Sequence, residues 1–211
     1  TRRVILRVGL ALIALAAAAF VLALFKTPAP AASASAASGS VSGIGSAAGG
    51  WQVMAEESEI AFTGTHAGSA FRGRFTRWQA ELRINPDDPV QSMIAATIET
   101  GSATDGVPLH DETLPLTEWF DVAHHPQASF RATRIVAGEG GSYAIEGLLN
   151  IKSHPIPVNG LNLVIEGDRV SISGQMKIKR SEAELGMESD PNAEWVSAEI
   201  GVEVRVAAAR K

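Results

Sequence analysis

The chain has no cysteine among its 211 residues. This absence excludes structural disulfides, thiolate zinc sites, iron–sulfur clusters, thiol catalysis and a lipoprotein anchor. Acidic residues are missing from the first fifty positions, which carry the basic residues Arg2, Arg3, Arg7 and Lys26. Residues 51–211 therefore hold 14 basic residues against 23 acidic ones, a net charge of −9. An acidic body of this kind excludes nucleic acid as a partner, because phosphate contacts need clustered Lys and Arg.

An uninterrupted apolar run lies near the start of the chain. Residues 8–25 are all apolar or Gly, and three arginines precede them. At about 1.5 Å per residue in a helix, the run approaches the thickness of a bilayer core. The positive flank predicts that everything after Lys26 is exported. Small-x-small sites such as Ala34-Ser35-Ala36 follow, so residues 1–26 are predicted to be either a membrane anchor helix or a cleaved signal sequence.

The segment after this run has no charge and no aromatic residue. Residues 27–50 are almost wholly Ala, Ser, Gly and Pro. Such a composition cannot bury enough apolar surface to offset its ordering entropy, so we predict a flexible linker. Residues 51–211 then fit one domain of ordinary size.

Within this domain the apolar residues recur with a period of two. Tyr143, Ile145, Gly147, Leu149 and Ile151 alternate with more polar neighbours, which is typical of a strand with one buried face. Similar runs recur along the domain, and turn signals rich in Gly, Pro and Asp separate them. We predict an all-β antiparallel barrel of eight strands.

Two places depart from simple alternation. The apolar parity changes between Phe75 and Trp78, which predicts a bulge or sharp bend in one long strand. Residues 110–120 carry early acidic residues and an apolar set around Pro115, which predicts a short helical segment over one end of the barrel.

The interior of an eight-stranded barrel is either filled by side chains or occupied by one ligand. The alternation cannot decide between the two. The predicted inward-facing set, which would line any cavity, is Ile60, Phe62, Phe71, Phe75, Ile98, Phe130, Tyr143, Ile145, Leu149, Ile151, Met176 and Ile178.

Residues 51–210 carry an ordered set of short motifs: Trp51, Ser58-x-Ile60-x-Phe62, Gly73-x-Phe75, Asp111, Leu114, Glu118-Trp119-Phe120-Asp121-Val122, Pro126, Phe130, Tyr143-x-Ile145-x-Gly147-x-Leu149-x-Ile151-Lys152, Pro157-Val158, Gly174 and Arg180. This set resembles the YceI-like family of periplasmic, lipocalin-like proteins. No single motif is specific to this family, but the set of motifs in this order is. Two departures affect the rim, namely Ser153-His154-Pro155 after Lys152 and the acidic stretch 181–186 after Arg180.

The resemblance implies a non-enzymatic binding protein whose barrel holds a polyisoprenoid lipid, either an isoprenoid quinone or a polyprenyl phosphate, as a non-covalent ligand. It also implies a periplasmic location, tethered to the inner membrane or cleaved and soluble, and a di-haem b-type membrane cytochrome as partner. A lipid head group needs a few convergent polar groups at the mouth. The candidates are Arg180, His66, His110 and Asp111.

Two alternatives remain beside lipid binding. The five histidines, His66, His110, His124, His125 and His154, could bind a metal or haem in a surface-acting accessory protein of a respiratory complex, although their spacing is not that of a known site. Hydrolysis through Asp111 or Asp121 with a histidine lacks any nucleophile motif. The sequence therefore favours lipid binding over both.

Overall fold

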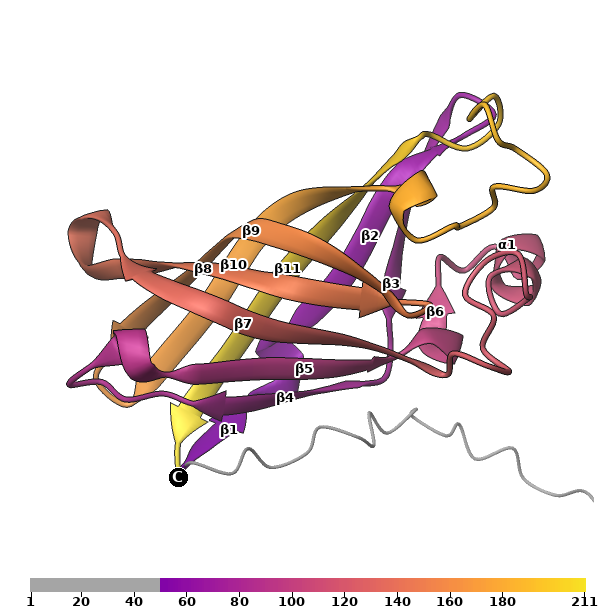
Figure 1. Ribbon diagram of the computed structural model, residues 1–211. Coiled ribbons are helices and arrows are strands. Elements are labelled where there is room, and N and C mark those ends of the chain that lie inside the picture. The colour runs from indigo at the N-terminus through magenta and orange to yellow at the C-terminus, as the bar shows by residue number, and fades with distance from the viewer. Residues whose placement is uncertain (1–49) are drawn as a thin grey trace, which may run out of the picture. The chain divides into compact units, whose positions relative to one another are not determined.

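The computed structural model describes residues 50–211 (Figure 1). The predictions for residues 1–26 and for most of the 27–50 linker lie outside the described residues. From residue 50 to residue 211, no helix is long and apolar enough to cross a membrane.

The described chain forms one strongly curled antiparallel sheet with a single short α-helix. The hydrogen-bonded order is β4-β5-β7-β8-β9-β10-β11-β2-β3-β6, and β1 pairs with β11. The strands are β1 (Trp51–Val53), β2 (Glu59–His66), β3 (Ser69–Phe75), β4 (Trp78–Arg83), β5 (Met93–Glu99), β6 (Ala103–Thr104), β7 (Gln127–Ala137), β8 (Ser142–Ile151), β9 (His154–Glu166), β10 (Arg169–Lys179) and β11 (Glu199–Arg210).

The all-β antiparallel class is confirmed, but the prediction of eight strands is wrong. The described sheet has 11 strands and forms a half-barrel whose hydrogen-bonded path runs from β4 to β6. β1 has three residues and β6 has two, so neither is long enough to show alternation. The run 71–84, which reads as one strand, is divided between β3 and β4.

The bend predicted between Phe75 and Trp78 is confirmed, because the run is broken there into β3 and β4. β3 pairs with β2, whereas β4 pairs with β5. Thr76 and Arg77 therefore connect two strands that lie near opposite ends of the hydrogen-bonded strand order. Ser102 holds this crossing: its carbonyl accepts from Thr76 N–H at 3.1 Å and its hydroxyl from Arg77 N–H at 3.0 Å.

The end of the sheet that carries β1 and the C-terminus is packed tightly, and we call it the sealed end (Figure 1). The indole N–H of Trp51 donates to the Ile84 carbonyl at 3.1 Å, which ties β1 to the end of β4. Leu163 and Ala208 are both 0% exposed, and Ile145 is 1% exposed. Inward-facing aliphatic side chains thus fill the concave face at this end.

The helix α1 (Pro108–Thr113) lies at the opposite end of the sheet (Figure 1). It begins and ends earlier than the predicted segment 110–120, because Pro108 suits the first turn and Pro115 disfavours helical geometry just before it. Residues 114–125 form successive turns instead. The α1 end comprises α1, the tip of the β2–β3 hairpin and residues 183–198, which precede β11 (Figure 1).

Candidate functional site

Midway between the two ends, the concave face carries apolar side chains that pack against the core yet stay partly exposed. Ala96, Phe130 and Leu149 are successive cross-strand partners on β5, β7 and β8. Met176 and Val202 form a similar pair on β10 and β11. These side chains are therefore less fully enclosed than those of the buried core. We call this set, with Phe71 of β3, the belt: Phe71, Ala96, Phe130, Leu149, Met176 and Val202.

Three phenyl rings lie against the wall of the sheet beside glycines of neighbouring strands. A Cβ placed on Gly147 would lie 2.4 Å from the Phe130 ring, and one on Gly64 would lie 2.6 Å from the Phe71 ring. Phe62 occupies the same position beside Gly73, at 2.2 Å. Because each ring uses the space of an absent side chain on the next strand, it takes up less room at the centre of the half-barrel.

The twelve residues predicted to face inward divide into two groups. All belong to one apolar cluster or pack against it. The buried group is Ile60, Phe62, Ile98, Ile145, Ile151 and Ile178, and the partly exposed group is Phe71, Phe75, Phe130, Tyr143, Leu149 and Met176.

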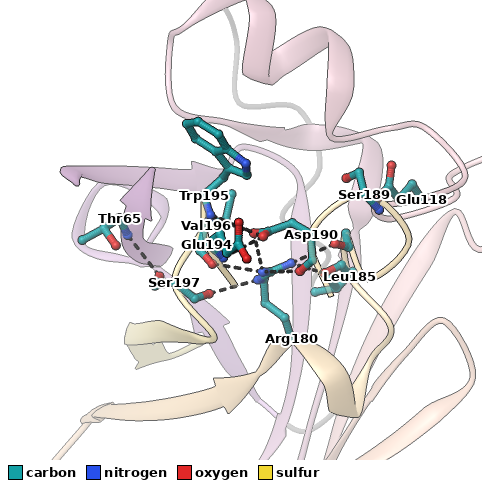
Figure 2. A network of polar contacts seen from close by, with 11 residues as sticks. Thr65, Glu118, Arg180, Leu185, Ser189, Asp190, Glu194, Trp195, Val196 and Ser197 are labelled. Atoms are coloured by element: carbon teal, nitrogen blue, oxygen red, sulfur yellow. Dashed lines mark hydrogen bonds and ion pairs between the residues drawn. The ribbon is translucent and has the colours of Figure 1, made fainter. Parts of the chain in front are cut away.

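A buried guanidinium organises the loop at the α1 end (Figure 2). Arg180 is 1% exposed, and its Nη2 lies 2.9 Å from an Asp190 carboxylate oxygen. Its other nitrogens donate to the carbonyls of Ser197 at 3.0 Å and Leu185 at 2.8 Å. The full set of carbonyl acceptors is Leu185, Gly186, Asp190, Val196 and Ser197. Arg180, predicted as a head-group ligand, thus gives its donors to the loop and has a structural role here.

Asp190 completes this network from the opposite side (Figure 2). Its carboxylate accepts from the backbone N–H groups of Val196 at 2.9 Å and Glu194 at 2.7 Å. These hydrogen bonds, with Val196 contributing most, lower the pKa of Asp190 below its ordinary value. Ser197 then joins the loop to β2 through Thr65, whose N–H donates to the serine hydroxyl at 3.1 Å.

Beside this network, three polar residues form a hydrogen-bonded chain. His66 and His110 were predicted as site residues, and Asp105 was not. Nδ1 of His110, on α1, lies 2.7 Å from a carboxylate oxygen of Asp105. Nε2 of the same ring lies 3.0 Å from Nδ1 of His66, the last residue of β2. Val196 bridges to His66 as its β-partner, so the Arg180 network and the histidine chain meet. The structure thus brings His66 and His110 into direct contact.

Asp111, the fourth predicted head-group candidate, positions the histidine chain. Its carboxylate accepts from the Thr104 hydroxyl at 2.7 Å and from the Asp105 N–H at 3.0 Å. The Thr104 hydroxyl is the main cause of the lowered pKa of Asp111. Asp105 is held further by the Val107 N–H, which donates to its other carboxylate oxygen at 3.0 Å.

The segment Glu118-Trp119-Phe120-Asp121 holds the turns beneath this end. Glu118 accepts from the Ser189 N–H at 2.6 Å, and hydrogen bonds from Ser189 lower its pKa. Trp119 lies 5.9 Å from the Arg180 guanidinium carbon, and the buried Phe120 packs edge-on against Phe75 at 5.8 Å. Asp121 has φ 46° and bonds to His124, within a tight turn.

The remaining histidines do not converge. His124 is paired with Asp121, and His154 lies 3.9 Å from Glu184 with its Nδ1 buried and unpartnered. Across residues 50–211, no group of three or more His, Cys, Asp or Glu side chains is placed to hold a metal ion.

A hollow of about 1070 Å³ lies beside β2, β3, β10 and β11, and its lining includes Gly64 and the belt residue Phe71. The side chains of Arg72, Lys177 and Glu199 border it, and each forms an exposed ion pair. We assign the belt rather than this hollow as the apolar site, because these bordering side chains are charged and exposed.

Sequence comparison then identifies the domain. The YceI-like domain profile matches residues 51–208. The chain belongs to the YceI-like family. The UPF0312 proteins ECA1782 of Pectobacterium atrosepticum and PC1_2518 of Pectobacterium carotovorum are each 25% identical to it over 181 residues, covering 78% of this chain and 94% of theirs.

Solved structures share the YceI-like fold. BcnA of Burkholderia cenocepacia has a TM-score of 0.68 and 22% identity, covering 74% of this chain and 99% of BcnA. A polyisoprenoid-binding domain from Saccharophagus degradans, implicated in plant cell wall breakdown, has a TM-score of 0.61 and 14% identity, covering 77% and 99%. The YceI protein of Campylobacter jejuni has a TM-score of 0.56 and 19% identity, covering 66% and 84%.

Four site residues, Asp105, Asp190, Ala96 and Val202, were not among the predicted site residues. Asp105 and Asp190 lie in loops, and their partners are backbone N–H groups and side chains up to ten residues away, which no repeating pattern marks. Ala96 belongs to the alternating run 94–98 but is small. The sequence pattern does not distinguish an alanine that faces a ligand from one that packs in the core.

Proposed function

We propose that the concave face binds the chain of a polyisoprenoid lipid along the belt, with its head group at the α1 end. The belt carries this proposal, because it presents partly exposed apolar side chains on an otherwise well-packed inner face. Each methylene buried there would contribute about 0.8 kcal/mol, so an isoprenoid tail needs no charged contact to be held. The solved polyisoprenoid-binding domain of Saccharophagus degradans supports this choice of ligand.

The biological setting follows from the N-terminal sequence. We propose that residues 1–26 export the domain to the periplasm and either tether it to the inner membrane or are cleaved there. The lipid would be an isoprenoid quinone or a polyprenyl phosphate, and a di-haem b-type cytochrome would be a fitting membrane partner. In this setting the domain stores, shields or transfers the lipid without catalysing a reaction on it.

The test is mass spectrometry of an organic extract from the full chain, purified gently from an exporting host. The variant Ala96→Phe adds a ring to the belt, whereas Ala95→Phe adds one on the other face of β5. We expect about one prenyl lipid per protein for the wild type and for Ala95→Phe, and none for Ala96→Phe. Equal lipid in both variants, or no lipid in the wild type, would contradict the proposal.

A further inference from the structure

The hydrogen bonds of the histidine chain at the α1 end run in one direction, and the Asp105 carboxylate determines that direction. An ionised Asp105 can only accept, so Nδ1 of His110 must carry the proton in their 2.7 Å contact. In a neutral ring, Nε2 of His110 is then an acceptor, and the 3.0 Å contact requires a proton on Nδ1 of His66. Neutral His66 therefore keeps an unprotonated Nε2.

This last nitrogen is placed where a ligand could meet it. Among residues 50–211, Nε2 of His66 has no hydrogen-bond partner. Alternation along β2 puts His66 on the same face as Ile60 and Phe62, the face that carries the core. The Phe71 ring lies beside Gly64, between Phe62 and His66 on that face.

We propose that the Asp105–His110–His66 chain makes Nε2 of His66 the acceptor for the hydroxyl group of a prenyl lipid, either a quinol or a prenol. The inference rests on the proposed function, because the lipid tail along the belt would bring the head group to this end. The inference narrows the proposed lipid to its hydroxyl-bearing form, a quinol rather than the quinone or a prenol rather than its phosphate. A carbonyl, an ether oxygen or a fully ionised phosphate offers no proton to Nε2 of a neutral His66.

Paired probes test the inference at pH 8, where unperturbed imidazoles are neutral. The full chain is titrated with geranylgeraniol and with its methyl ether, in which a methyl group replaces the hydroxyl proton. We expect the alcohol to bind roughly 3- to 10-fold more tightly, as expected for one hydrogen bond. Ubiquinol-2 and ubiquinone-2 form a second pair, and the tighter of the two hydroxyl probes shows whether the head group is a quinol or a prenol.

Two variants separate a specific acceptor from a structural role. His66→Phe should remove the preference for the alcohol while leaving ether binding within about twofold. Asp105→Asn should also remove the preference for the alcohol, although residue 105 does not contact the ligand. The Val107 N–H would hold the amide oxygen of Asn, so its NH₂ would donate to His110 and reverse the direction of the chain.

A measurement without ligand keeps the inference testable if a variant folds poorly. ¹⁵N NMR of histidine-labelled wild-type protein should show the proton of His66 on Nδ1. A proton on Nε2, or equal binding of alcohol and ether by the wild type, would overturn the inference while leaving the proposed function intact. Failure of every probe to bind would instead overturn the proposed function.

Discussion

The two ends of the half-barrel are closed in different ways. At the sealed end, regular strands bring aliphatic side chains together, and Leu163 and Ala208 have no exposed surface. At the α1 end, turns and a long loop are held by polar contacts around Arg180 and His110. Apolar packing closes the sealed end with aliphatic side chains, whereas the polar groups of the α1 end can form hydrogen bonds with a head group. The belt lies between the two.

The largest expected effect comes from the buried guanidinium. Arg180→Met should lower the free energy of unfolding by about 3–5 kcal/mol, because it leaves the Asp190 carboxylate and several carbonyls without their partner. Urea denaturation measures this. Asp190→Asn, which keeps an acceptor oxygen, should cost less. An equal or smaller loss for Arg180→Met would show that the rim is not organised by this residue.

A pair of leucines compares the sealed end with the belt. Leu163→Ala should cost about 2–5 kcal/mol, because Leu163 is 0% exposed and its removal leaves a cavity. Leu149→Ala should cost distinctly less, since its side chain already borders accessible space. Both values come from urea denaturation of lipid-free protein. Equal losses would mean that the belt is packed as tightly as the sealed end.

A pair of glycines compares the α1 end with the sealed end. Gly186 has φ +65°, and a Cβ there would lie 2.8 Å from the Trp119 ring. Gly167, in the β9–β10 turn, has φ +59° with nothing within 4 Å. Gly186→Ala should therefore cost about 1–3 kcal/mol more than Gly167→Ala, as overpacking adds to backbone strain. Thermal unfolding with calorimetry would measure both, and similar costs would contradict the packing of Trp119.

The smallest effect is a dependence on acid pH to which three carboxylates of the α1 end contribute. Asp111, Glu118 and Asp190 have lowered pKa values there. Such a carboxylate adds stability that is complete above its unfolded pKa, about 4, and is lost as pH falls through the folded pKa. Urea midpoints should therefore change little because of these groups from pH 7 to 5 and fall below pH 4. Asp190→Asn should flatten that fall, and an unchanged slope would contradict the assignment.

The sequence predicted the parts of this structure that alternation and local chemistry control. The all-β class and the bend after Phe75 depend on which face a residue occupies, and for the same reason the twelve residues of the inward set share one apolar cluster. Their role in lining a ligand cavity stays a prediction. The strand number failed because β1 and β6 are too short to show a period. The α1 end was predicted only as a set of polar candidates, because the contact between His66 and His110 joins residues 44 positions apart. The burial of Arg180 likewise depends on loop carbonyls that no sequence period marks.

The most direct test is a crystal structure of the full chain purified without removal of lipid. The account predicts one elongated ligand along the belt beside Ala96, Phe130 and Met176, with its head group within hydrogen-bond distance of Nε2 of His66. A concave face closed by its own side chains, or a lipid bound on the outer face instead, would contradict it.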